Sequence, residues 1–342
     1  MRVSMSVGLA GDFGKTVERV VALDKAGLDM ALVGEGYGFD AATMMGYLAA
    51  KTEHVQIGAG ILSIYSRTPA MIAQTAAGLD YLSGGRAILG LGTSGPQVIE
   101  GWHGVPFDRP MQRTRDIIDI CRQVWRRERL THEGAFTVPL PPGQGTGLGK
   151  PIRLNVHPVR DRIPIYVASL GPNNVEMTAE VADGWLLFLY LPERADSVWG
   201  SALARGTAKR SADLAPLEVH AGGTVAIGDG IEHLRDLARP RVALYVGGMG
   251  ARGSNFYNDL ARRYGYEAEA ERIQALYLDG KRQEAEAAVP AELLEKTSLI
   301  GPAGYVKDRI AAYRDTGVTV LSIDPLGEDP VKVLEQVKEW AA

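Results

Sequence analysis

Several residues suited to proton transfer lie in glycine-rich segments that follow short apolar runs. Glu35 lies within Gly34-Glu35-Gly36-Tyr37-Gly38, a segment too rich in glycine for a helix or strand. Because glycine lets a backbone approach a ligand closely, we predict that Glu35 faces a pocket as a polar contact or proton donor. A solvated loop acid is the alternative. Tyr37 would add stacking area to the pocket or pack within the loop.

A second such segment carries a histidine and a tryptophan. The run Gly90-Leu91-Gly92-Thr93-Ser94-Gly95 is followed by Glu100-Gly101-Trp102-His103-Gly104. Among the six histidines, His103 is the best candidate for a role in catalysis. A histidine that ties down its loop by hydrogen bonding is the alternative. Thr93 is predicted to contact a cofactor, and Trp102 to shape the substrate pocket.

Small residues also end the run from Val55 to Ile61. Glycine and alanine at a strand end leave room for a flat group against the backbone. We therefore predict that a flat group lies against the backbone around Gly60 and Ile61 and that Ser63 offers a hydroxyl there. Tyr65 is predicted in the substrate pocket. Arg67 would bind an anion or cap the end of the fold.

An anion site is expected where a helix begins after the apolar run from Ile163 to Ala168. Free backbone N–H groups and the positive end of the helix dipole attract phosphate at such a position. A plain turn capped by a side chain is the alternative. The residues predicted to bind the cofactor here are Ala168, Ser169, Leu170, Gly171, Pro172 and Asn173.

The sequence lacks the patterns of several other chemistries. It contains no G-x-S-x-G elbow, no H-E-x-x-H and no His/Asp cluster with metal-ligand spacing, so no metal is expected. Strand ends that are rich in glycine and poor in ionisable groups, next to a helix N-terminus, suit a bulky planar cofactor with a phosphate tail. In such enzymes the cofactor supplies the difficult chemistry.

The elements that position these residues alternate between strand and helix. Continuous apolar strands are covered on both faces, which favours a parallel sheet. Four strand-helix units fit into about 125 residues. This length per unit matches that of an eight-unit barrel of about 250 residues. We predict one (β/α)8 barrel over residues 1–342, with insertions at about 131–162 and 251–297. A doubly wound sheet is the rival fold, but Gly8 to Gly14 lacks the G-x-G-x-x-G spacing.

Composition narrows the possible partners. The net charge of −4 offers no basic surface for nucleic acid, and no apolar run reaches the length of a membrane helix. No targeting signal is found at the start, so a cytoplasmic location is expected. Cys121 is the only cysteine and is predicted to be a buried structural thiol. The arginines and lysines of residues 251–297 are interpreted as a solvated helix face, with contact to an anion as the alternative.

Taken together, these segments resemble the bacterial luciferase-like superfamily across essentially the whole chain. The pattern is most similar to its F420-dependent oxidoreductase branch. The motifs are specific for the superfamily and less specific for the cofactor. The segments that carry the resemblance are Gly58 to Ala76, Leu82 to Gly92, Glu100 to Phe107, Pro164 to Pro172 and Ala179 to Gly184.

The resemblance implies a TIM barrel that binds the deazaflavin coenzyme F420, which moves a hydride through its ring carbon C5. It also implies a non-prolyl cis peptide at Gly60-Ile61, a phosphate held by Ala168 to Asn173, and a homodimer. In one respect the sequence departs from the family. Several F420 enzymes carry an Asp-His pair where this chain has Glu35-Gly36. The role of proton transfer is therefore assigned to Glu35 or His103.

Three functions remain open from the sequence. The first is an F420-dependent oxidoreductase that transfers a hydride between F420 and a small organic substrate. The second is an FMN-dependent monooxygenase of the same superfamily. The third is a non-catalytic barrel that stores or binds a cofactor. The substrate itself is not specified by the sequence, because substrate contacts come from loops and insertions that vary without changing the fold.

Overall fold

The apolar runs form a closed parallel barrel in the computed structural model, which describes residues 1–8 and 11–342. Strand β10 pairs with both β1 and β8, and this pairing closes the ring. The predicted (β/α)8 barrel is therefore confirmed. Part of the glycine-bearing stretch 8–14 lies outside the described residues. The barrel strands are β1 (Arg2–Val7), β2 (Met30–Val33), β3 (Gln56–Ala59), β5 (Ala87–Gly92), β6 (Ile165–Ala168), β7 (Gly184–Leu186), β8 (Glu218–Ile227) and β10 (Val320–Pro325).

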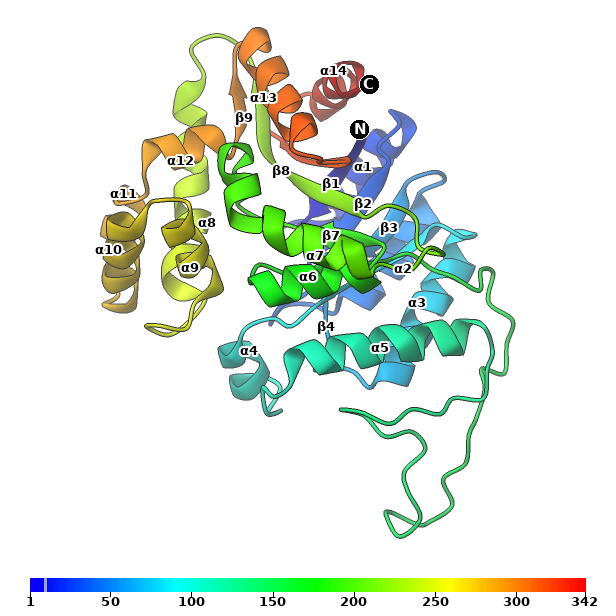
Figure 1. Ribbon diagram of the computed structural model, residues 1–342. Helices are drawn as coiled ribbons and strands as arrows, with labels where there is room; N and C mark the ends of the chain where they lie inside the picture. Colours follow the sequence, from blue (N-terminus) through cyan, green and yellow to red (C-terminus); the bar gives the residue numbers. More distant parts are fainter. Residues whose placement is uncertain (9–10) are drawn as a thin grey trace.

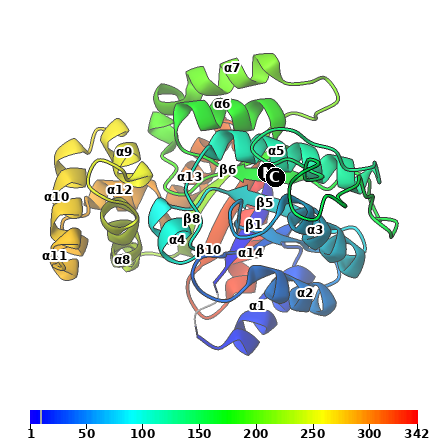
Figure 2. The ribbon, with the colours of Figure 1, turned by 90° about the horizontal axis from the view of Figure 1, so that it is seen from below.

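Helices surround the barrel, as the view along it shows (Figure 2). Local signals set their ends. Gly27, with φ of 87°, follows the first helix, and Thr68 caps the third helix with Pro69 at its first position. The surrounding helices are α1 (Phe13–Lys25), α2 (Ala41–Lys51), α3 (Pro69–Ser83), α5 (Pro110–Trp125), α6 (Pro172–Val181), α7 (Ser201–Lys209), α13 (Ala303–Asp315) and α14 (Pro330–Ala341).

One end of the barrel is plugged by side chains. Arg2 donates hydrogen bonds to Gln56 Oε1 at 2.8 Å and to the Tyr166 hydroxyl at 3.0 Å. Glu218 accepts from both Arg2 and Tyr166. These residues belong to the amino ends of their strands, so only the carboxyl ends remain available for a ligand. An interior cluster that includes Met30, Leu32, Ile88, Tyr166, Leu186 and Val320 fills the space between.

Two short strands that the sequence analysis did not predict extend the sheet. β4 (Leu62–Ser63) pairs with β5, and β9 (Leu299–Gly301) pairs with β8. A short helix, α4 (Pro96–Gly101), follows β5. β8 runs without a break through Gly222 and Gly223. Cys121 is fully buried, and burial raises the pKa of its thiol, as expected of a structural cysteine.

The two predicted insertions differ in character. The segment between α5 and β6 is the long green loop in Figure 1, and it contains an antiparallel bridge between His132 and Val138. The segment between β8 and β9 forms a helical group beside the barrel and starts earlier than predicted (Figure 1). Its elements are a 3-10 helix η3 (Glu232–Ala238), α8 (Arg239–Ala243), a π-helical turn η4 (Leu244–Gly248), α9 (Phe256–Arg263), α10 (Glu267–Leu278), α11 (Arg282–Ala287) and α12 (Ala291–Lys296).

Candidate active site

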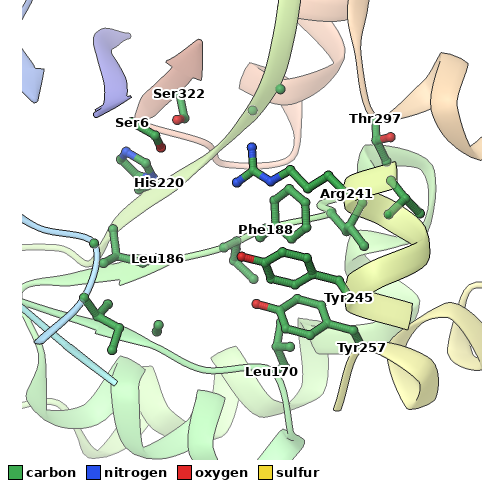
Figure 3. Close-up of a pocket in the computed structure, with 18 of the residues that line it drawn as sticks. Ser6, Leu170, Leu186, Phe188, His220, Arg241, Tyr245, Tyr257, Thr297 and Ser322 are labelled. Carbon is green, nitrogen blue, oxygen red and sulfur yellow. The ribbon is translucent and has the colours of Figure 1, made fainter. Parts of the chain in front are cut away.

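A cavity of about 470 Å³ opens at the carboxyl ends of the strands. Its floor comes from the barrel and one wall comes from the helical group between β8 and β9 (Figure 3). This is the end at which barrel enzymes place their active sites. A volume of this size also suits a small-molecule or cofactor site.

One side of the cavity is formed mainly by backbone atoms, with few side chains projecting from it. The peptide bond between Gly60 and Ile61 is cis, as the resemblance predicted, and both residues line the cavity. A Cβ atom built on Gly90 would lie 1.7 Å from the carbonyl oxygen of Ala59. One on Gly92 would lie 2.8 Å from Ile61 Cγ1. Only glycine therefore allows β5 to pack against the Gly60-Ile61 segment in this way.

Close to this segment, the loop at the start of α6 is where the anion site is predicted. Ala168, Ser169, Leu170 and Gly171 line the cavity. Gly171 is the N-cap of α6 and no side chain caps that helix, so the N–H groups of its first turn are not taken by a capping side chain. Pro172 is the first helical residue and does not line the cavity. Asn174 lines it, whereas Asn173, which was predicted to, does not.

Three side chains hold the loop before α6 by its carbonyl groups. The indole N–H of Trp185 donates to the Ser169 carbonyl at 2.9 Å. Trp199 and Arg263 both donate to the Leu170 carbonyl, at 3.1 and 3.0 Å. With its carbonyls fixed outward, the loop can present its N–H groups to a ligand without rearranging, which lowers the cost of binding.

Glu35 borders the cavity, but its carboxylate already has partners. Arg67 donates to both oxygens at 2.7 Å, in the bidentate geometry that arginine favours. The backbone N–H of Ala41, at the start of α2, donates to the same carboxylate at 3.1 Å. Arg67 also pairs with Asp40, the N-cap of α2. This geometry favours a role for Glu35 in fixing the loop after β2, and its predicted part in catalysis stays a prediction.

We expect Arg67→Ala to lower the free energy of unfolding by about 3 kcal/mol, because Glu35 would keep a carboxylate that is only 10% exposed and lacks its cation. Chemical denaturation measures this. Arg126→Ala is the control, since its pair with Glu128 is about half exposed and should contribute less than about 1 kcal/mol. An equally small loss for both variants would mean that Glu35 is solvated and free to exchange protons.

Most of the other predicted residues lie outside the main cavity. His103 follows α4 and does not line it, while Tyr37 and Trp102 are exposed and line a second, shallower hollow. Tyr65 is buried against Phe107 and donates to the Asp108 carbonyl at 2.8 Å. The Ser63 hydroxyl accepts from the Tyr65 N–H at 3.2 Å. Thr93 does line the cavity.

His220 lies on the inner face of β8 and was not predicted from the sequence as a site residue. The side chain is 5% exposed, borders the cavity and lies 2.6 Å from the Ser4 hydroxyl through Nε2. The buried Nδ1 atom has no hydrogen-bond partner within residues 1–8 and 11–342. Burial lowers the pKa of His220 to about 4, so the imidazole is neutral at pH 7. Alternation along β8 was an available signal, because His220, Gly222 and Thr224 share its inner face.

A cationic and aromatic wall faces the barrel from the helical group (Figure 3). The Arg241 guanidinium lies 4.3 Å from the centre of the Phe188 ring. Phe188 in turn packs against Tyr245 at 4.5 Å and Tyr257 at 5.9 Å between ring centres. All four residues line the cavity. Sequence spacing gave no sign of this wall, because its members come from three separate segments.

Two further observations concern the part of the chain that the structure describes. Among the described residues, no group of three or more His, Cys, Asp or Glu side chains is placed to hold a metal ion. Within the same part of the chain, no helix has both the length and the apolar character needed to span a bilayer.

Residues 1–320 match the family described as luciferase-like monooxygenase. A Mycobacterium tuberculosis protein assigned by name as a coenzyme F420-dependent oxidoreductase is 38% identical over 330 residues, which cover 95% of this chain and 93% of that protein. The chain belongs to the luciferase-like family, as the resemblance predicted.

Solved structures share the fold. The coenzyme F420-dependent tetrahydromethanopterin reductase from Methanopyrus kandleri superposes with a TM-score of 0.80 at 22% identity, covering 98% of this chain and 96% of that one. The oxygenating constituent of 3,6-diketocamphane monooxygenase from Pseudomonas putida, in complex with FMN, gives 0.65 at 17% identity, covering 100% and 98%. At these identities the likeness concerns the fold.

Proposed function

We propose that the protein is an F420-dependent oxidoreductase that transfers a hydride between the deazaflavin and a small organic substrate. One observation carries the proposal: the glycine-backed Gly60-Ile61 segment and an uncapped helix N-terminus face the same cavity. The first suits a flat ring system and the second a phosphate. The name of the Mycobacterium tuberculosis relative supports the choice of F420.

The residues of the cavity fit such a cofactor. Gly60 and Ile61 would lie against its rings, and the N–H groups at the start of α6, with Asn174, would hold its phosphate. When bound, F420 supplies a carbon centre that accepts or donates a hydride. The chain's own residues bind and orient the reactants and move the accompanying proton.

We assign the proton to His220. It is a neutral imidazole at pH 7, it borders the cavity, and its Nδ1 atom lacks a protein partner among the described residues. Glu35 is held by Arg67, and His103 does not line the cavity. Nε2 hydrogen-bonds to the Ser4 hydroxyl, which fixes the orientation of the ring beside the cavity.

Titration of the protein with F420 and, separately, with FMN tests the cofactor. We expect micromolar or tighter binding of F420, followed by fluorescence, and much weaker binding of FMN. Preferential binding of FMN would replace the proposal by the oxygen-dependent alternative, which the fold shared with the FMN-bound monooxygenase keeps open. F420 binding without turnover of any carbonyl, alkene or alcohol would favour the non-catalytic barrel.

Asn174→Asp is expected to weaken F420 binding at least tenfold, because it places a carboxylate beside the phosphate site. Asn173→Asp is the matched control, since it adds the same charge to the same helical turn at a residue that does not line the cavity. Equilibrium titration with F420 measures both. Equal effects of the two variants would contradict the phosphate site proposed here.

We also propose that the chain is a homodimer, which rests on the family resemblance. Light scattering at micromolar concentration measures the mass directly. A monomer of 36.8 kDa would contradict this proposal and leave the cofactor assignment untouched.

A further inference from the structure

Three hydrogen-bond donors point to one part of the cavity from the helical group. The Arg241 guanidinium and the hydroxyl groups of Tyr245 and Tyr257 extend in the same direction, toward the barrel (Figure 3). Arg241 belongs to α8, Tyr245 to η4 and Tyr257 to α9. In the part of the chain that the structure describes, neither hydroxyl has a hydrogen-bond partner, and neither does the guanidinium.

Ring packing fixes the direction of these donors. Tyr245 and Tyr257 meet edge to face, with 4.7 Å between ring centres, and both contact Phe188. The guanidinium lies over Phe188 at 4.3 Å and is 5.9 Å from the centre of the Tyr245 ring. A stacked guanidinium keeps its N–H groups free at the edge of its plane, where an oxyanion binds.

Charge pairing leaves Arg241 as the open cation of the cavity. Glu35 and Asp324 also line it, and each has its own arginine, Arg67 at 2.7 Å and Arg19 at 3.7 Å. Within the described residues, no carboxylate lies within ion-pair distance of Arg241. Burial raises the pKa of Tyr257, so this phenol remains a donor near neutral pH.

We propose that Arg241, Tyr245 and Tyr257 bind an oxyanion group of the substrate, a carboxylate or a phosphate. The proposal rests on the proposed function and names the substrate class of the same cavity. The substrate would be a small acid whose anionic end meets the helical group, while its reacting carbon lies toward the barrel floor and His220. The anionic groups of F420 itself are the competing occupant.

Binding of small probes to the F420-loaded protein tests this assignment by calorimetry. Benzoate carries the anion and benzamide is its neutral counterpart of the same shape. We expect benzoate to bind at least tenfold more tightly than benzamide, and inorganic phosphate to compete with benzoate. Arg241→Gln should abolish this preference, and Arg241→Lys should retain part of it.

Two further variants separate the site from general charge effects. Tyr257→Phe removes one donor and keeps the ring, so benzoate binding should weaken severalfold with unchanged benzamide binding. Arg252→Gln is the control, because Arg252 is exposed, pairs with Asp279 and does not line the cavity. An equal loss for Arg252→Gln, or equal binding of benzoate and benzamide by the wild type, would overturn the proposal.

Binding of the cofactor is measured separately, with F420 and with its truncated form FO. FO keeps the deazaflavin rings and lacks the phosphate and glutamate tail. If Arg241 holds substrate, Arg241→Gln leaves the affinity for both unchanged. Weaker F420 binding with unchanged FO binding would assign Arg241 to the cofactor tail and overturn the substrate proposal. If neither F420 nor FO binds, the proposed function fails, and benzoate binding to the unloaded protein still decides whether the oxyanion site exists.

Discussion

Gly90→Ala is expected to destabilise the barrel severely and to abolish cofactor binding. A Cβ atom at this position would lie 1.7 Å from the Ala59 carbonyl oxygen and 2.8 Å from its carbon. The clash is with backbone on a neighbouring strand, so no side-chain rotation relieves it. Overpacking of a core typically costs about 1–3 kcal/mol, and we expect Gly90→Ala to reach the top of that range or exceed it.

Gly78→Ala is the matched control for this experiment. Gly78 lies within α3, and a Cβ atom built there meets nothing within 4 Å. Alanine should stabilise the helix by up to about 1 kcal/mol. Thermal unfolding and F420 titration measure both variants. A stable Gly90→Ala protein with intact F420 binding would show that β5 can move away from the Gly60-Ile61 segment and that the cavity does not depend on this contact.

His220→Gln is expected to lower turnover about a hundredfold or more, with F420 binding unchanged. General acid-base catalysis contributes rate factors of this size, and glutamine keeps hydrogen-bonding capacity without a titrating nitrogen. Steady-state kinetics with any substrate that the wild type accepts measures the loss. Glu35→Gln and His103→Gln serve as comparisons. A larger loss of turnover for either of them would assign proton transfer to that residue, as predicted from the sequence.

The same substitution has a signature that needs no substrate. The pKa of His220 is lowered to about 4 from the value of 6.5 in the unfolded chain. Between these values the unfolded state binds more protons, so the free energy of unfolding falls as the pH is lowered. The slope reaches at most about 1.4 kcal/mol per pH unit and vanishes above pH 6.5 and below pH 4. His220→Gln should remove this slope. Identical pH dependence of the two proteins would show that His220 titrates with the same pKa in the folded and the unfolded protein.

Hydrophobic periodicity and turn residues predicted the barrel because both act locally. Short apolar runs are buried between helices in a parallel sheet, and Gly27 and Pro69 mark helix boundaries through their own backbone preferences. The two short strands β4 and β9 were missed, since two or three residues carry no period. The helical group between β8 and β9 was placed too late because residues 231–245, although predicted to be helical, were not counted as part of the insertion.

The candidate site was harder to predict because long-range pairing decides which polar groups are free. Glu35 is flanked by glycine in the sequence, yet Arg67 occupies its carboxylate from 32 residues away. His103 lies in a glycine-bounded loop, but that loop lies beside the cavity. His220 gives no local signal beyond its place on an alternating strand. Gly60, Ile61 and residues 168–171 do line the cavity, because strand ends and a helix start carry local signals, whereas Pro172 and Asn173 do not. Their contact with a cofactor stays a prediction.

The cavity takes its two halves from different parts of the chain. The barrel supplies the glycine-backed segment and the start of α6, while residues 232–296 supply Arg241, Tyr245 and Tyr257. That stretch leaves the barrel after β8 and returns at β9, so its sequence can change with little effect on strand pairing. Changes within this segment therefore alter the side chains that face the substrate and leave the barrel strands unchanged. A chimaera that carries another family member's segment between β8 and β9 would take on the donor's substrates, and it would keep this chain's cofactor where the donor segment retains Arg263, which holds the loop before α6.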